Sequence, residues 1–336
     1  QVFNIVISII KSKAIAVLLG PAGMGINGLL MSAIGLISTL TNFRLGNSAV
    51  KDIAEAHTVG NQDQIAKVIG VLRRLVWITG LLGALVTLIL SPWLSELTFG
   101  NTDYTTAFIW LSVTLLLNQL SSGQLVLLQG MRQLNYLAKA NMVGAIMGLV
   151  VSVPIYYVYG IDGIVPTMIL SSVFSLVISW FFSSKLKIKE VSISRKDILA
   201  EGKGMLQLGF MLSLTSLMAA GESFIVRSYI SNTGSLDDVG LYTAGFAIIG
   251  TYVGLIFAAM GTDYFPRLSG VTHNNNETRI LVIQQSEIAV LILAPILTVF
   301  LIFINWVVII LYSVKFTPVN EMIHWAALGM YFKVVS

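Results

Sequence analysis

The chain has 336 residues, of which 56% are hydrophobic and 11% are charged, and its mean hydropathy is +0.84. A soluble domain carries about 25% charged residues, so this composition excludes an ordinary soluble protein and indicates an integral membrane protein. The net charge of +4 fits the orientation of membrane segments better than nucleic-acid binding, and the absence of cysteine excludes disulfides and thiolate metal sites.

Apolar segments follow one another along the whole chain, and most are long enough to cross the ~30 Å hydrocarbon core as a helix. They cover residues 2–19, 25–45, 75–94, 104–128, 141–159, 164–182, 205–230, 239–264, 288–311 and 319–335. This pattern predicts an all-α, polytopic membrane protein with about ten transmembrane helices. The chain begins and ends inside apolar runs, so we expect it to be a fragment of a longer protein.

The stretch GMGING, residues 23–28, follows the first segment and matches the G-x-G-x-x-G pattern of dinucleotide-binding turns. It lacks the preceding strand and the acidic residue about 20 positions later that this function requires. We place GMGING instead in a short turn between the first two segments, because GPAG at residues 20–23 is typical of a tight reversal between two helices.

Lys and Arg are distributed unevenly between the connections. The connections after the second, fourth, sixth and eighth segments hold fourteen of them, whereas the others hold only Lys315. Basic residues stay on the cytoplasmic side of a membrane, so we expect these even-numbered connections to be cytoplasmic. The basic stretch 185–204 is the longest polar one, and it predicts a cytoplasmic linker between an N-lobe (1–184) and a truncated C-lobe (205–336). A role in binding anionic lipid or in regulation is the alternative for this stretch.

An internal repeat supports these two lobes. A shift of 215 residues aligns the second lobe with the first without gaps, and it pairs Gly25 with Gly240 and Gly35 with Gly250. Hydropathy and loop polarity stay in phase along this alignment. Because the shift spans six helices, an even number, both copies have the same orientation in the membrane, which predicts a parallel repeat of two six-helix lobes.

Charged residues inside apolar segments are the candidate site residues: Lys11, Lys13, Arg44, Glu222 and Arg227. Each costs about +2.5 to +3.5 kcal/mol at a bilayer centre, so we expect each to face water or a partner. Four of them are cations, which suit an anionic substrate such as a phosphate. Two alternatives stay open, since Arg44 and Arg227 can extend to an interface and Glu222 can pair with Arg227.

No catalytic, metal or cofactor residues are predicted, because the three histidines are not spaced as zinc ligands and no Ser, His and Asp set is evident.

Several turns and loops resemble those of a known family. They are LGPAGMG (19–25), LGNSAV (45–50), FGNTDY (99–104), YGIDG (159–163), YFPRL (264–268) and KFTP (315–318) with Trp325. The sequence resembles the bacterial polysaccharide-biosynthesis flippases of the O-antigen translocase and lipid III flippase type. These belong to the multidrug/oligosaccharidyl-lipid/polysaccharide exporter superfamily.

This resemblance implies a transporter of the bacterial inner membrane rather than an enzyme, with two lobes around a central cavity. It implies alternating-access movement of an undecaprenyl-diphosphate-linked oligosaccharide, with polysaccharide polymerase machinery as a further candidate partner. Cationic residues would meet the pyrophosphate, and the positions that fit by type and depth are Lys11, Lys13, Arg44 and Arg227.

Two rival functions remain open at the level of sequence. A cation-coupled multidrug exporter of the same superfamily should place carboxylates in its cavity, for which only Glu222, Asp263 and Glu287 qualify. A membrane-bound polymerase or ligase should carry a large periplasmic loop with catalytic residues, and every connection expected on that side is short.

Overall fold

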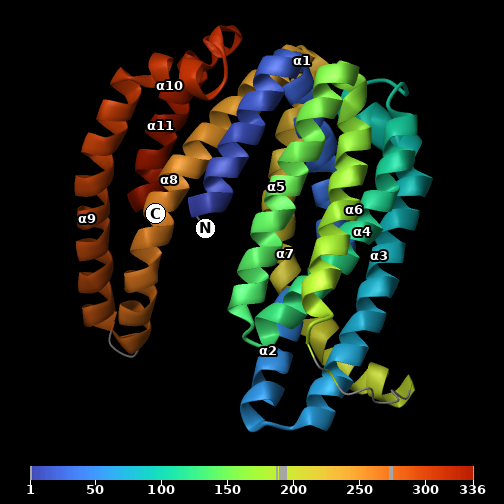
Figure 1. The fold of residues 1–336 in the computed structure, drawn as a ribbon. Helices are drawn as coiled ribbons and strands as arrows, with labels where there is room; N and C mark the ends of the chain where they lie inside the picture. Colours follow the sequence, from blue (N-terminus) through green and yellow to red (C-terminus); the bar gives the residue numbers. More distant parts are fainter. Residues whose placement is uncertain (1, 187, 189–194, 272–274, 336) are drawn as a thin grey trace.

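The computed structural model describes residues 2–186, 188, 195–271 and 275–335, and in these ranges the chain is helical with short turns and no β-strand (Figure 1). The predicted all-α class is therefore confirmed. The elements are α1 (Val2–Asn42), α2 (Leu45–Val59), α3 (Gln62–Phe99), α4 (Thr105–Gly130), α5 (Leu134–Tyr159), η1 (Gly160–Gly163), α6 (Ile164–Ser183), α7 (Arg195–Thr233), α8 (Leu236–Val271), α9 (Asn275–Ile302), α10 (Ile304–Leu311), η2 (Val314–Phe316) and α11 (Val319–Val335).

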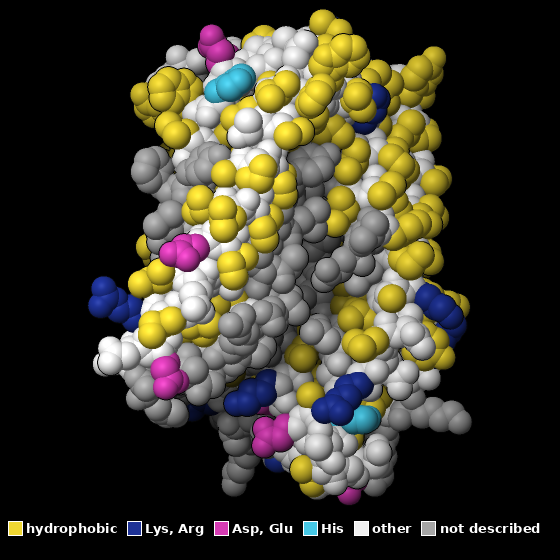
Figure 2. Space-filling model, turned by 90° about the vertical axis from the view of Figure 1, so that its left-hand side faces the viewer, with side chains coloured by type: hydrophobic (Ala, Val, Ile, Leu, Met, Phe, Trp, Pro, Cys, Tyr) yellow, Lys and Arg dark blue, Asp and Glu magenta, His cyan; other side chains and the backbone are white. Residues whose placement is uncertain are grey.

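Six stretches of the described chain are long and apolar enough to cross a membrane: Ile5–Asn42, Gln62–Phe99, Thr105–Gly130, Leu134–Ser183, Gly202–Thr233 and Asn275–Ile302. The first and fourth contain 38 and 50 residues, more than the ~20 that one crossing needs, and each holds two of the predicted segments. Figure 2 shows hydrophobic side chains over the middle and upper part of one face, with most of its Lys and Arg toward the lower end. The protein is a multi-pass membrane protein, as predicted.

α1 consists of two helices that meet at Gly20, where the backbone has φ of 70° and ψ of −170°. Only glycine adopts this conformation readily, and Pro21 suits the first turn of the second half because no backbone donor is needed there. In Figure 1 the chain rises from the N-terminus to this break and then descends toward α2. The reversal is thus confirmed at Gly20, whereas residues 23–28, expected in the turn, are helical.

Replacing Gly20 by alanine is expected to lower the free energy of unfolding by about 1–3 kcal/mol, because alanine is strained in this conformation. An added Cβ would meet nothing within 4 Å, so the backbone alone sets this cost. Thermal unfolding of the purified protein in detergent measures it. Gly144→Ala is the control, since Gly144 in α5 has equally open surroundings, and equal melting of the two variants would contradict the strained turn.

The connection expected as a polar loop after the second segment is an amphipathic helix, α2. Its buried residues recur every three or four positions and pack on α3 and α4: Leu45, Ser48, Ala49, Ile53 and Ala56. The hydropathy of the sequence did not indicate this helix, because one narrow apolar stripe is enough to hold a helix at the surface of a bundle. α2 lies at the end of the molecule opposite the Gly20 break (Figure 1).

α7, predicted as the first helix of the C-lobe, packs along α1, α2 and α3. Near α2, Gly209 lies directly against the backbone carbonyl of Phe43. Near the other end, the side-chain amide of Asn232 donates to the carbonyl oxygen of Leu97 at 3.2 Å. α7 begins at Arg195, inside the predicted linker, and residues 187 and 189–194 of that linker lie outside the described residues.

The second half of α1 crosses α8 at very close range near the Gly20 break, and we name this contact the α1–α8 crossing. A methyl group on Gly25 would overlap the carbonyl oxygen of Leu236, and a methyl group on Gly240 would overlap that of Pro21. Only glycine lets the two backbones approach this closely.

The contact at the α1–α8 crossing is reciprocal under the predicted repeat. The residues involved form three pairs that are each 215 positions apart: Pro21 and Leu236, Gly25 and Gly240, and Gly28 and Thr243. Two copies of one unit make reciprocal contacts of this kind where they meet at a two-fold axis. The crossing therefore supports the parallel repeat, while the lobe boundaries stay a prediction.

Candidate anion-binding site

α6 carries a hydroxyl side chain at every fourth residue: Thr167, Ser171, Ser175, Ser179 and Ser183. Residues four apart share one face of a helix, and this helix packs on α4. Ser175 and Ser179 are hydrogen-bonded to Ser121 of α4 at 2.9 and 3.1 Å. Ser183 donates to Oε1 of Gln124 at 2.7 Å. Such pairs hold helices together within a membrane, where no water competes for them.

Of the other two hydroxyls of this stripe, that of Ser171 has no hydrogen-bond partner within the described residues, and that of Thr167 lies beside the Tyr156 hydroxyl. They line a cavity of about 210 Å³ between α1, α4, α5 and α6, which we call the Lys11 cavity. Its lining residues are Lys11, Asn27, Met31, Ile34, Thr114, Asn118, Tyr156, Thr167, Met168, Ser171 and Ser172. Lys11 is the only charged residue among them.

The chemistry of the Lys11 cavity suits an anionic oxygen. A buried hydroxyl without a partner costs about 1–3 kcal/mol, and this cost disappears when an acceptor binds. A phosphate oxygen accepts strong hydrogen bonds from an ammonium group and from hydroxyls such as those of Thr167 and Ser171. No Asp or Glu lines the cavity, so nothing there repels an anion or neutralises Lys11.

Replacing Ser171 by alanine is expected to leave the free energy of unfolding unchanged or to raise it by about 1 kcal/mol. The reason is that alanine removes a buried hydroxyl that has no partner within the described residues. Ser179→Ala is the matched control, because it breaks the hydrogen bond to Ser121 and should cost about 0.5–1.5 kcal/mol. Thermal unfolding in detergent compares the two, and equal destabilisation would show that the Ser171 hydroxyl already has a partner.

Lys11 and Lys13, each predicted to face water or a partner, point to different sides of α1, because residues two apart on a helix differ by about 200°. Lys11 is half-buried in its cavity. Lys13 is exposed, and its Nζ donates to the carbonyl oxygen of Ile310 in α10. The structure therefore separates the two lysines, one toward α4 to α6 and the other toward α10.

Arg227 joins α7 to α8. Its guanidinium donates to the carbonyl oxygen of Ser223 at 3.0 Å, to the Ser223 hydroxyl, and to Oγ1 of Thr243 at 3.3 Å. It also lies 5.5 Å from the ring centre of Tyr242, within the range of a cation–π interaction. Glu222 is exposed, and no ion pair joins it to Arg227 within the part of the chain that the structure describes.

Arg44 lies apart from the other candidates. It precedes α2 with φ of 44° and ψ of 35°, and its side chain is exposed. At 1.5 Å per residue, the second half of α1 places it roughly 36 Å from the Gly20 break. This position at the α2 end agrees with the alternative that Arg44 extends to an interface.

Charge alone did not reveal the neutral residues of the Lys11 cavity. Their spacing is the signal that could have found them, because Thr114 and Asn118, like Thr167 and Ser171, are four positions apart. Each pair therefore shares a helix face. A polar pair on one face of an otherwise apolar membrane helix marks a face turned away from lipid.

The profile of the family described as "Polysaccharide biosynthesis protein" matches residues 14–321. The chain belongs to this family. The match reaches from the first half of α1 into α11, and Lys11 and Lys13 lie just before its start. Membership in the polysaccharide biosynthesis family confirms the resemblance that the turn motifs indicated.

Two curated relatives are the lipid III flippases of Escherichia coli (strain K12) and Shigella flexneri. Each is 24% identical to this chain over 329 residues, which cover 97% of the chain and 78% of the relative.

Solved structures with the same fold include multidrug resistance MATE family transporters of the MOP superfamily. The inward-facing form has a TM-score of 0.77 at 17% identity, covering 99% of this chain and 78% of the transporter. The outward-facing form has a TM-score of 0.63 at 16% identity, covering 99% and 76%.

Proposed function

We propose that this protein is a flippase that moves an undecaprenyl-diphosphate-linked oligosaccharide from the cytoplasmic to the periplasmic leaflet of the bacterial inner membrane. The Lys11 cavity carries this proposal, since it offers an ammonium group, the unpaired hydroxyl of Ser171 and further hydroxyls, and no carboxylate, inside the membrane-spanning bundle. The similarity to the lipid III flippases and the polysaccharide biosynthesis family supports the class of substrate.

The physical problem is to carry two phosphates and a sugar through hydrocarbon, where burying a charge without a partner is very costly. Lys11, with Thr167 and Ser171, would hold phosphate oxygens while the polyprenyl chain stays in the lipid. Lys13 and Arg227, which lie toward α10 and α8, are candidates to meet the head group between the lobes. Rocking of the lobes would expose the site to each side in turn, and no bond is made or broken.

We place the α2 end of the molecule in the cytoplasm. Basic residues lie in α2 and in the first third of α3: Lys51, Lys67, Arg73 and Arg74. On the face drawn in Figure 2, most Lys and Arg side chains also lie toward the lower end. In this orientation the α1–α8 crossing closes the periplasmic side. The arrangement would then accept substrate from the cytoplasm.

Complementation tests the proposed function. The full-length gene is expressed in a bacterial strain that lacks its own O-antigen or common-antigen flippase, and surface polysaccharide is measured on gels at matched protein levels. Restored polysaccharide is the expected result. Failure with every compatible repeat unit, together with new resistance to lipophilic dyes, would contradict it.

The second candidate function is a cation-coupled multidrug exporter, because the MATE transporters share this fold. Such an exporter needs carboxylates that face its cavity. Of the three acids that the sequence offers for this role, Glu222 and Glu287 are exposed, and the side chain of Asp263 lies outside the described residues. The Lys11 cavity has no carboxylate, whereas a separate cavity is lined by Asp103 and Asp162. Growth in ethidium, compared with and without the gene, distinguishes the exporter from the flippase.

A further inference from the structure

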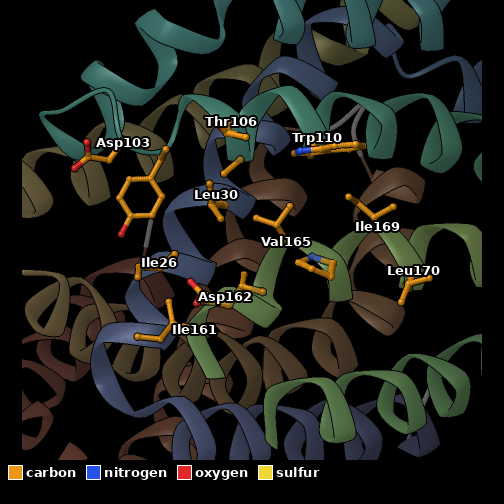
Figure 3. Close-up of a pocket in the computed structure, with 14 residues that line it drawn as sticks. Ile26, Leu30, Asp103, Thr106, Trp110, Ile161, Asp162, Val165, Ile169 and Leu170 are labelled. Carbon is orange, nitrogen blue, oxygen red and sulfur yellow. The ribbon is translucent and has the colours of Figure 1, made fainter. Parts of the chain in front are cut away.

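A second and larger cavity lies at the end of the bundle near the Gly20 break. It has a volume of about 640 Å³, within the range of roughly 300–1,000 Å³ that ligand sites occupy. It lies between the second half of α1 and the starts of α4 and α6 (Figure 3). Apart from two carboxylates, the Tyr104 hydroxyl and Thr106, its lining is apolar or aromatic: Ile26, Leu30, Ala107, Trp110, Ile161, Ile164, Val165, Pro166, Ile169 and Leu170. We call it the Asp103 pocket.

The two ends of the Asp103 pocket differ in character. In Figure 3, Asp103 and Asp162 lie toward one end, and Trp110, Ile169 and Leu170 toward the other. The pKa of the Tyr104 hydroxyl is raised by burial and then by the negative charges of Asp103 and Asp162, so both carboxylates act at the same place. One end is therefore anionic and the other apolar.

The negative charge of this pocket is not compensated by the protein. No Lys, Arg or His lines it, and neither carboxylate has an ion-pair partner among the described residues. Both Asp side chains are exposed, but they lie beside an apolar wall, where the effective dielectric constant is lower than in bulk water, so a cation gains more from them there than in solution. The ring faces of Tyr104 and Trp110 also attract cations.

We propose that the Asp103 pocket binds the positively charged group of an amphiphile, with that group between Asp103 and Asp162 and the apolar body along Trp110, Ile169 and Leu170. Two sources have this chemistry: a membrane lipid whose zwitterionic head group ends in an ammonium, and a lipophilic cation that enters from the aqueous side.

The Asp103 pocket is separate from the Lys11 cavity, although both use α1, α4 and α6. On α4 the Asp103 pocket ends at Trp110, and the Lys11 cavity begins one turn later at Thr114. The bundle thus carries a negative site near its end and a positive site deeper inside. The inference does not rest on the proposed flippase function, because a pyrophosphate would be repelled from the Asp103 pocket.

Equilibrium dialysis of radiolabelled tetraphenylphosphonium tests the site, with the full-length purified protein in a nonionic detergent. We expect saturable binding at one site, weakened about tenfold in the double variant Asp103→Asn with Asp162→Asn. Trp110→Ala should also weaken binding. Asp237→Asn is the matched control, because Asp237 is an exposed acid at the start of α8 and does not line the pocket.

Binding that is unsaturable, or equally strong in the double variant and the wild type, would overturn the proposal. A second experiment identifies the source of the cation. It measures tetraphenylphosphonium binding to the protein in nanodiscs of phosphatidylglycerol with and without phosphatidylethanolamine. Competition by phosphatidylethanolamine supports an amine lipid as the occupant. Saturable binding that is unaffected by this lipid and lost in the double variant supports a lipophilic cation instead.

Discussion

Replacing Gly240 by valine is expected to reduce surface polysaccharide to background and to destabilise the purified protein by about 3 kcal/mol, the upper part of the range for overpacked sites. The side chain would occupy the space of the Pro21 carbonyl, and a Cβ at this position would lie only 3.1 Å from the backbone nitrogen of Gly25. Backbone atoms cannot rotate away as a flexible side chain can, so α1 and α8 must separate. Thermal unfolding and surface polysaccharide measure the two effects.

Both helices supply matched controls for this prediction. Gly250 in α8 and Gly35 in α1 have nothing within 4 Å of an added Cβ, so Gly250→Val and Gly35→Val should stay close to wild type. Gly25→Val should behave like Gly240→Val, because the contact is reciprocal. Equal stability of all four variants would contradict the α1–α8 crossing, and loss of only one member of the Gly25 and Gly240 pair would contradict its symmetry.

Replacing Lys11 by alanine is expected to lower the rate of surface polysaccharide formation about 10- to 100-fold, the equivalent of losing charged hydrogen bonds worth about 1.5–3 kcal/mol. Lys11→Glu should abolish formation, since a carboxylate in the same cavity repels phosphate. Pulse labelling of surface polysaccharide in the complemented strain, at matched protein levels, measures both effects.

Lys51→Ala is the control for the Lys11 variants, because Lys51 is an exposed cation on α2 and lines neither of the two cavities considered above. Lys11→Arg tests whether charge alone is sufficient, and it should retain part of the rate. Wild-type polysaccharide with Lys11→Ala would show that this lysine does not meet the substrate. It would leave the flippase function itself intact, since complementation by the parent tests that separately.

The helices could be predicted from the sequence because membrane crossing places a strong demand on composition: nearly every residue of a span must be apolar. The same demand is absent at the membrane surface, and this is why α2 was expected as a loop. The packing of α7 on α1 to α3 depends on contacts between distant segments, which local hydropathy does not contain. Residues 23–28 are helical because the reversal is confined to Gly20.

The candidate site was predicted in part for a similar reason. Lys11 was identifiable because a charge inside a membrane is costly and therefore conspicuous. Its neighbours Asn118 and Ser171 are uncharged, so their cost is smaller and their role appears only when α4 and α6 are packed together. The sequence also grouped Lys11 with Lys13 by depth, whereas the helical angle between them sends the two side chains to different sides of α1.

The α1–α8 crossing lies close to one end of α8, with Gly240 in its second turn and Val271 at the far end. At 1.5 Å per residue, about 46 Å of α8 separates the crossing at Gly240 from Val271. A turn of about 10° around the glycines would sweep the far end through roughly 8 Å, while residues one helical turn from the crossing would shift by only about 1 Å. A small rotation of α8 about the α1–α8 crossing would therefore produce a large displacement at its Val271 end. The packing near Gly240 would change little.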